Sequence, residues 1–388
     1  MIYPSGHIKS EIMKPAYFDN SGTTAVAEKV LEEMMPFFSE DYGNPSSIHS
    51  MGDTAAKAVS NARKRVAAAM GSRPSEIIFT SGGTEADNLA LIGTVTRSGR
   101  KKIITSATEH SAVLETCAYL RSFGYEAVIL PTDREGRVRA EDLLKAVDTD
   151  TAVVSVMAAN NVIGTIQPIA EIAEIAHRYG ALFHTDAVQA FTKTDIDVVR
   201  DGIDLMSVSG HKIHGPKGVG ALYVRSGVNI GPTMFGGGQE HGIRSSTENI
   251  PGIVGLGKAS ELAMSTMKED VERMTRLRDT IIDGILNIDG SYLNGPNDGR
   301  LCNNAHFGFS GIKGMDLVLS LSRMNIMAST ASACSAGSTE PSHVMTAIGR
   351  TPNEALSSLR ISLSRYTTDE EAKYLLDSVP KAVRMLRG

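Results

Sequence analysis

The sequence predicts an α/β protein with a large, mostly parallel sheet domain and a smaller α+β domain. With 388 residues, the chain is long enough for two such units. Between about residues 60 and 225, short β-branched runs alternate with longer segments of helical period, as in a parallel sheet covered on both faces. Beyond about residue 286 the runs alternate like antiparallel strands. We place the large domain at 16–260 and the small domain at 1–15 and 261–388.

The expected elements follow from these periods in chain order. Strands of the large sheet are expected at 77–80, 102–105, 127–130, 152–156, 181–184 and 205–208. Helices with apolar residues at every third or fourth position are expected at 55–70, 85–97, 111–123 and 168–179, and a long helical stretch at 252–286 leads out of the domain. The small domain is expected to hold strands at 305–309 and 359–363 and helices at 314–322 and 368–386.

Composition excludes several classes of partner. The net charge of -5 is spread without long like-sign runs, and no segment interleaves basic and aromatic residues as a nucleic-acid groove would. No segment offers the roughly 20 apolar residues of a membrane span, and the N-terminus lacks the apolar core of a signal peptide. Three cysteines are too few for a disulfide framework, so we expect thiols in a cytoplasmic protein. We expect no resident metal.

Polar clusters follow five of the expected strands, where the carboxyl ends of parallel strands meet at one crevice. They are residues 81–84 (SGGT), 108–110 (TEH), 160–161 (NN), 186–189 (DAVQ) and 209–212 (SGHK). The glycine-rich turn before a helix, with Gly83 and Thr84, is typical of an anion site, although plain helix capping is equally compatible with it. It lacks the GK[ST] of a nucleotide P-loop, which favours phosphate over a dinucleotide.

Lys212 and Asp186 indicate which kind of phosphate compound this anion site could bind. A lysine is usually a solvated surface charge, but Lys212 follows a strand and faces the crevice. A buried carboxylate at Asp186 needs a cationic partner, and a pyridinium nitrogen provides one. Pyridoxal phosphate requires a lysine for its aldehyde, a carboxylate for its ring nitrogen and an anion site for its phosphate. The sequence therefore predicts this cofactor, held by Lys212.

Other residues of the crevice acquire roles around such a ring. His110 can stack on the ring and move protons, and Asn161 and Gln189 can bond the ring hydroxyl. Each of them, taken singly, is more often a satisfied buried side chain. Cys334 lies in a run of small residues without a period, which favours an exposed loop and a nucleophilic thiol over an incidental one.

Nearly the whole chain resembles the class-V, fold-type I pyridoxal phosphate enzymes, and among them the group I (NifS/IscS-like) cysteine desulfurases. The motifs that carry the resemblance are residues 17–20 (YFDN), 43–47 (GNPSS), 79–85 (FTSGGTE), 108–110 (TEH), 160–161 (NN), 184–189 (HTDAVQ), 210–212 (GHK), 236–240 (GGGQE), 244–249 (RSSTEN), 332–335 (SACS), 340–342 (EPS) and 359–367 (LRISLSRYT). So many short motifs in the same order are highly specific.

The resemblance implies a role for each matching residue. Lys212 would form the Schiff base, and the phosphate would be held by Gly83, Thr84, Ser209 and His211. The cofactor ring would be contacted by His110, Asn161, Asp186 and Gln189, and the substrate by Asn161 and Arg360, whose planar fork suits a carboxylate. Thr247 would reach the phosphate in the partner subunit, which implies a homodimer with shared active sites.

The implied reaction takes sulfur from L-cysteine and leaves alanine. Cys334 would attack the substrate sulfur and carry it as a persulfide to a sulfur-acceptor protein, for iron–sulfur cluster assembly or tRNA thiolation. A selenocysteine lyase or another class-V aminotransferase, in which Cys334 is incidental, is the nearest alternative. A non-catalytic sulfur-carrier module with the same fold is a second.

The chain departs from the family pattern at four positions. Val162 stands where a glutamate is usual, Ala331 and Ser246 replace glycines, and His241 replaces an arginine. None of the four removes a catalytic group. They bear on substrate preference and partner choice more than on the class of reaction.

Overall fold

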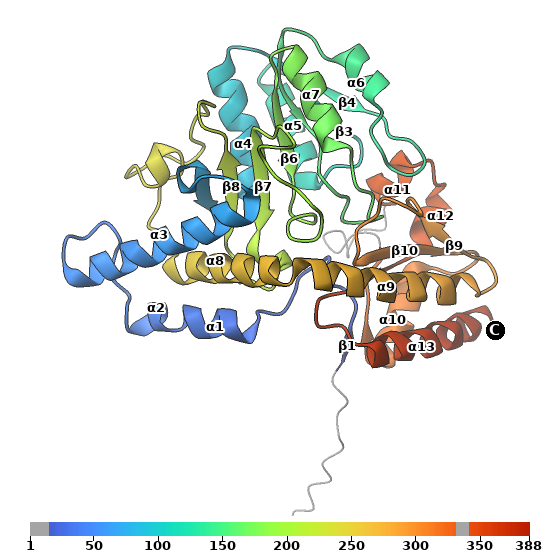
Figure 1. Ribbon diagram of the computed structural model, residues 1–388. Helices are drawn as coiled ribbons and strands as arrows, with labels where there is room; N and C mark the ends of the chain where they lie inside the picture. The colour runs from blue at the N-terminus through green and yellow to red at the C-terminus, as the bar shows by residue number, and fades with distance from the viewer. Residues whose placement is uncertain (1–14, 331–340) are drawn as a thin grey trace, which may run out of the picture.

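The computed structural model, which describes residues 15–330 and 341–388, is built around one seven-stranded sheet (Figure 1). The strand order is β2-β8-β7-β6-β5-β3-β4. The strands are β2 (Ile77–Thr80), β3 (Lys102–Ser106), β4 (Glu126–Leu130), β5 (Thr151–Ser155), β6 (Leu182–Asp186), β7 (Leu205–Ser209) and β8 (Gly220–Val224). Strands β3 to β7 pair in parallel, so the mostly parallel sheet of an α/β fold is confirmed.

Strand β8 is the exception, because it pairs antiparallel with both β7 and β2. Only residues 210–219 separate β7 from β8, and this stretch holds a single turn of 3-10 helix, η2 (Gly210–Lys212). A parallel return needs a crossover of a dozen or more residues, usually a helix, so the chain turns back instead. The sequence patterns above did not predict β8.

Helices cover both faces of the sheet, which explains why its strands are runs of β-branched residues rather than alternating ones. One face packs against α3, α7 and α8, and the other against α4 and α5. The helices of this part are α1 (Glu28–Met34), α2 (Pro36–Ser39), α3 (Ser50–Met70), α4 (Gly83–Ser98), α5 (Ser111–Ser122), α6 (Ala140–Ala146), α7 (Ile169–Arg178) and α8 (Ile250–Ser265), with the 3-10 turns η1 (Pro74–Glu76) and η3 (Glu240–Gly242).

A second, antiparallel sheet has the order β12-β10-β9. Its strands are β9 (Ser291–Asn294), β10 (Asn304–Phe309) and β12 (Ser358–Ser362), and beside it the short β1 (Ala16–Tyr17) pairs in parallel with β11 (Ile326–Met327). The helices of this part are α9 (Met267–Leu286), α10 (Gly314–Arg323), α11 (His343–Ala347), α12 (Pro352–Leu356) and α13 (Asp369–Arg387). One face of the sheet packs with α9, α10 and α13 into a separate apolar core.

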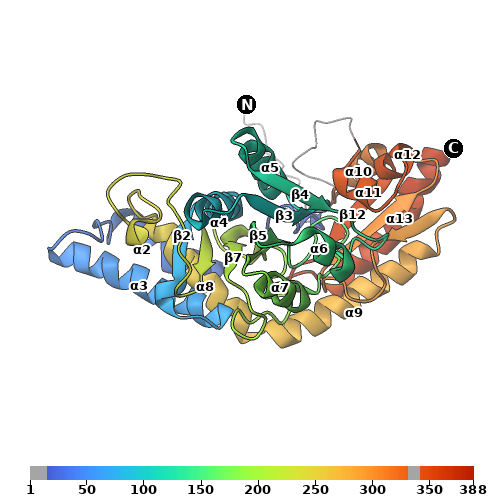
Figure 2. The same ribbon diagram turned by 90° about the horizontal axis from the view of Figure 1, so that it is seen from above.

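The expected helical stretch at 252–286 is two helices that meet at Thr266, whose φ of -126° and ψ of 11° break the helical path. Helix α8 packs on the first core and α9 on the second, and together they run along the whole molecule (Figures 1 and 2). We propose the two-domain division on this basis, with residues 16–18 counted in the small domain because Ala16 and Phe18 pack in its core. No helix among the described residues is long and apolar enough to cross a membrane.

Candidate active site

A cavity of about 230 Å³ lies beyond the carboxyl ends of β3, β5, β6 and β7, and Arg360 of the second sheet and residues 342–344 at the start of α11 close it. Apart from Thr247 and Cys334, every predicted site residue lines it. These residues are Gly83, Thr84, His110, Asn161, Asp186, Gln189, Ser209, His211, Lys212 and Arg360. The fold therefore brings together residues that lie up to 277 positions apart, from Gly83 to Arg360.

The first wall of the cavity is the N-terminus of α4. Helix α4 begins at Gly83, so its first backbone N–H groups have no partner within the helix and the positive end of its dipole faces the cavity. A Cβ atom on Gly220 would lie 2.5 Å from the carbonyl oxygen of Val208 and 2.8 Å from backbone atoms of Gly82. The side-chain-free Gly220 therefore allows β8 to pack directly under the turn.

Two side chains at the end of β7 and in the turn that follows it, Ser209 and His211, extend this anion site. Ser209 is the last residue of β7 and is buried. His211 contacts Thr23 Oγ1 through Nδ1 at 3.1 Å, and burial together with Lys212, Lys217 and Lys193 lowers its pKa to about 4. His211 is therefore a neutral hydrogen-bonding group at pH 7 rather than a cation.

Asp186 ends β6 at the base of the cavity and is 5% exposed. Its Oδ1 accepts the N–H of Val188 at 2.8 Å, which orients the carboxyl group. Burial raises the pKa of Asp186, while the charges of His110 and Lys212 act in the opposite direction. A cationic ligand at the cavity base would add to this compensation and keep the carboxylate ionised.

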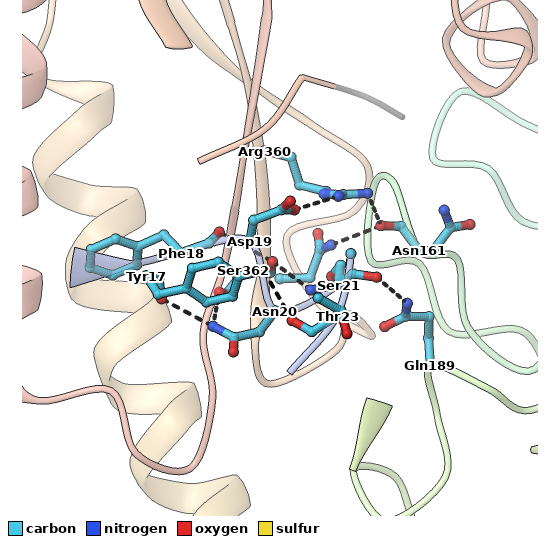
Figure 3. Close-up of polar contacts among 12 residues, drawn as sticks. Tyr17, Phe18, Asp19, Asn20, Ser21, Thr23, Asn161, Gln189, Arg360 and Ser362 are labelled. Atoms are coloured by element: carbon cyan, nitrogen blue, oxygen red, sulfur yellow. Dashed lines mark hydrogen bonds and ion pairs between the residues drawn. The ribbon is translucent and has the colours of Figure 1, made fainter. Parts of the chain in front are cut away.

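Lys212 lies on the η2 turn and reaches across the cavity to the chain after β1. Its Nζ donates to the carbonyl oxygens of Ser21 at 2.5 Å and of Gly22 at 2.6 Å. The same Ser21 carbonyl accepts Gln189 Nε2 at 3.0 Å (Figure 3). Residues 21 and 22 thus hold the lysine amine inside the cavity, close to the side chain of Gln189.

His110 caps α5 and occupies the opposite wall. Its Nδ1 accepts the N–H of Ala112 at 3.1 Å, so in the neutral ring the proton sits on Nε2. Asn161 is presented by a turn that Asn160 builds, because Asn160 Oδ1 accepts the N–H groups of Val162 and Ile163, each at 2.9 Å. Both walls are thus fixed by side chain to backbone hydrogen bonds.

Arg360 enters from β12 and is almost fully buried. Its Nη1 donates to the backbone oxygen of Asn161 at 3.1 Å and its Nη2 to Asp19 Oδ1 at 2.8 Å (Figure 3). Each η nitrogen carries two hydrogens, so each retains one N–H for a further acceptor. An arginine fork held in this way at a cavity wall is suited to a carboxylate.

The structure adds lining residues to which the sequence patterns assigned no role, although Glu109, Val188 and Ser342 lie within the motifs named above. They are Ser21, Gly22, Asp87, Glu109, Ser111, Met157, Val188, Ser342, His343 and Val344. Asp87 lies three residues beyond Thr84, one helical turn further along α4, so helical period could have revealed it. Glu109, Ser111 and Val188 adjoin predicted site residues along the chain, whereas residues 21–22 and 342–344 come from distant segments.

Thr247 is exposed and does not line the cavity of its own chain, and Cys334 and Ala331 lie outside the described residues.

Ser246 has a φ of 147°, a conformation that glycine adopts far more readily, which explains why a glycine suits this position. His241 has a φ of 60°. Val162 is buried, lines the cavity and packs on Val344 and its neighbours.

The set of donors fits pyridoxal phosphate. Amides at a helix N-terminus suit the phosphate, and Lys212 suits the aldehyde. Asp186 suits a protonated ring nitrogen, because that cation would offset the cost of burying the carboxylate. Fold and site together define an enzyme of the pyridoxal phosphate class.

Comparison with known proteins shows to which family of pyridoxal phosphate enzymes the chain belongs. The aminotransferase class-V family model matches residues 16–375, so the chain belongs to this family of pyridoxal-phosphate-dependent enzymes. It is 50% identical to "Cysteine desulfurase IscS" of Methanosarcina thermophila over 97% of this chain and 93% of that protein. It is 49% identical to the protein of the same name in Clostridium botulinum strain Hall, with 96% of each chain covered.

Solved structures agree with these relatives. A "NIFS-like protein" superposes with a TM-score of 0.91 at 41% identity, covering 96% of this chain and all of that one. The structure titled "SspA in complex with cysteine" gives a TM-score of 0.80 at 38% identity, covering 91% and 99% of the two chains. Within the class-V family the chain is therefore a cysteine desulfurase, and the expected enzyme class and cofactor are confirmed.

Proposed function

We propose that the chain takes sulfur from L-cysteine with the cavity residues named above, releases L-alanine, and carries the sulfur as a persulfide on Cys334 to an acceptor protein. The observation that carries the proposal is the convergence of Lys212, Asp186, Arg360 and the N-terminus of α4 on one cavity. Sequence identity of 45–50% to named cysteine desulfurases supports the same reaction.

Each cavity residue then has a task that its contacts allow. Gly83, Thr84, Ser209 and His211 would hold the phosphate, and Asp186, Gln189 and Asn161 the ring. Bound pyridoxal phosphate supplies an electron sink for bonds at the α-carbon of the substrate. Lys212 Nζ would take and return a proton at that carbon, His110 Nε2 would exchange a proton with the substrate, and Arg360 would orient the substrate carboxylate.

Sulfur transfer requires a nucleophile from outside the described residues, and we assign this role to Cys334. Its thiolate would form an S–S bond to the substrate sulfur as the C–S bond breaks, and the carbon would keep that electron pair and gain a proton, which gives alanine. Ser329 pairs with the backbone of Arg360 at 2.7 and 3.4 Å, and Ser342 lines the cavity. The chain on either side of 331–340 thus lies at the site.

Cys334→Ser tests this assignment, because a hydroxyl cannot replace the thiolate. We expect release of sulfide and alanine from L-cysteine with a reductant to fall at least about a hundredfold, while the visible absorption of the bound cofactor is kept. Cys117→Ala is the matched control, since Cys117 is buried on α5 away from the cavity. Unchanged sulfide release by Cys334→Ser would contradict the proposal and favour a lyase in which this thiol is incidental.

We also propose a homodimer with shared sites, in which Thr247 reaches the phosphate of the partner subunit, and a cytoplasmic location. Thr247 is exposed and lies outside the cavity of its own chain, as expected for a residue that acts in a neighbour. The acceptor would be a protein of iron–sulfur cluster assembly or tRNA thiolation. Trapping the persulfide form on candidate acceptors and measuring sulfur transfer to each would decide between the two pathways.

A further inference from the structure

The second sheet has one apolar face and one polar face, and the polar face leads to the cavity. On β10, Ala305 and Phe307 point into the apolar core, so His306 between them points to the opposite face. The register places His306 directly opposite Arg360 on β12 and opposite Asn294 on β9. Asn294, His306 and Arg360 therefore form a row across the sheet that ends at the substrate side.

Each of these three buried side chains has one atom without a hydrogen-bond partner among the described residues. The atoms are Oδ1 of Asn294, Nε2 of His306 and Nε of Arg360. The side chains of Asn294 and His306 are fully buried, and Arg360 is 1% exposed. An unsatisfied buried polar atom costs roughly 1–3 kcal/mol, so three such atoms in neighbouring residues call for a common explanation.

One rearrangement of the side chains would give each of these three atoms a partner. Asn294 Nδ2 lies 3.1 Å from His306 Nδ1, and a half-turn of the Asn294 amide places Oδ1 there instead. His306 Nδ1–H then donates to Asn294 Oδ1, which leaves Nε2 as an acceptor. Arg360 Nε and His306 Nε2 do not bond in the structure, but they are a donor and an acceptor on directly opposite residues, and a side-chain rotation would pair them. This requires a neutral ring with one donor and one acceptor. Burial and the charges of Arg360, Arg300 and Arg350 lower the pKa of His306 to about 3, which keeps the ring neutral.

We propose that His306 is a positioning residue for Arg360, which it holds through Nε so that the two η nitrogens face the carboxylate of the amino-acid substrate. The inference rests on the role proposed above for Arg360. Asp19 and the backbone of Asn161 hold one N–H on each η nitrogen. A hydrogen bond from Nε to His306 would fix the remaining freedom of the guanidinium plane. Partners behind a binding group commonly fix its orientation in this way.

The test replaces His306 by Leu, which keeps apolar bulk but cannot accept a hydrogen bond, and by Gln, which can. For His306→Leu we expect KM for L-cysteine to rise at least about tenfold with kcat within about twofold, and for His306→Gln a recovery of most of that loss. Cysteamine, which lacks the carboxylate, should bind wild type and His306→Leu equally, as measured by the change in visible absorption of the holoenzyme.

Two further variants keep the test decisive. Phe307→Leu alters the core side of the same strand and should lower stability without changing KM. Asn294→Leu removes the partner of His306 Nδ1 and should raise KM about threefold even if His306→Leu does not fold. An unchanged KM in both His306→Leu and Asn294→Leu, or an equal loss of cysteamine binding, would overturn the proposal.

Arg360→Ala separates this inference from the proposed function. We expect it to weaken binding of L-cysteine strongly and of cysteamine little. If Arg360→Ala leaves L-cysteine binding unchanged, the proposed role of Arg360 is itself wrong. If Arg360→Ala weakens L-cysteine binding and the His306 variants do not, only the positioning role of His306 is refuted.

Discussion

Glu109 is a fully buried acid that belongs to the cavity wall without a place in the proposed reaction. Its Oε1 accepts the hydroxyl of Ser106 at 2.6 Å, and the N–H of Met157 lies 2.9 and 3.1 Å from its two oxygens. Burial raises its pKa from 4.5 to about 8, and the neighbouring Asp186 adds to the rise. Glu109 is therefore mostly protonated at pH 7 and joins two neighbouring strand ends as a neutral acid.

This protonation makes the free energy of unfolding depend on pH. Because the folded state binds the proton more tightly than the unfolded state, the contribution of Glu109 is present below about pH 4.5 and is lost as pH rises through about 8. Glu109→Gln cannot ionise, so the wild type should lose stability relative to this variant by up to about 1.4 kcal/mol per pH unit between pH 5 and 8. Denaturant unfolding of both holoenzymes at several pH values measures the difference.

Glu174→Gln, an exposed change of the same kind on α7, serves as the control and should give a curve parallel to that of the wild type. A parallel curve for Glu109→Gln as well would show that Glu109 is ionised in the folded protein.

At the scale of residues, sequence reasoning identified the groups whose chemistry is unusual for their position. A lysine after a buried strand and an acid at a strand end, Lys212 and Asp186, stand out because both are costly to bury without a ligand. The carbonyl oxygens of Ser21 and Gly22 that accept from Lys212 could not be found, since every residue has a carbonyl group. The orientation of Arg360 by its neighbour across the sheet, His306, depends on strand register, which a single sequence does not reveal.

At the scale of elements, the periodic segments were predicted closely and the irregular ones were not. The strands at 77–80 and 205–208 and the helices at 55–70 and 111–123 correspond within a few residues to β2, β7, α3 and α5. The short α6, α11 and α12 and the edge strand β9 were missed, because four to seven residues show no reliable period.

The break between α8 and α9 is held by side-chain hydrogen bonds from outside the two helices. Arg365, from the loop after β12, donates through Nε to Asp270 at 2.9 Å and through Nη2 to the backbone oxygen of Leu262 at 3.3 Å. Its Nη2 also contacts Thr266 Oγ1 and Asp270. One guanidinium therefore joins the end of one helix, the break and the start of the next.

Arg365→Ala removes this joint and leaves the mostly buried Asp270 without its countercharge. We expect the variant to lower the free energy of unfolding by about 2–4 kcal/mol, because breaking a buried pair costs about 3–5 kcal/mol and this pair keeps some solvent contact. Arg276 also lies on α9 and forms an exposed ion pair with Asp369 of α13, and Arg276→Ala should stay close to wild type. Urea unfolding of the three proteins measures the difference, and equal losses in both variants would refute the role of the junction.

At the scale of the molecule, a third of the exposed large apolar side chains among the described residues lie at one end, away from the second sheet. They lie on α1, on α2 and in the chain after it, and in the segment that leads to η3, all in the left half of Figure 1. The residues are Leu31, Met35, Phe38, Tyr42, Ile48, Met234 and Phe235. Exposed apolar clusters of this kind mark interaction surfaces, and Thr247 belongs to a neighbouring part of the chain.

If this end is the contact between the two subunits of the proposed homodimer, charging it should separate them and impair both sites at once. We expect Phe38→Glu combined with Ile48→Glu to shift the sedimentation coefficient from dimer to monomer and to weaken cofactor binding at least about tenfold, because Thr247 of the other subunit would no longer reach the phosphate. Phe123 is a similarly exposed aromatic that follows α5 near the opposite edge strand β4, and Phe123→Glu should change neither quantity. A monomeric wild type would exclude the shared site, and a dimeric double variant would place the subunit contact on another face.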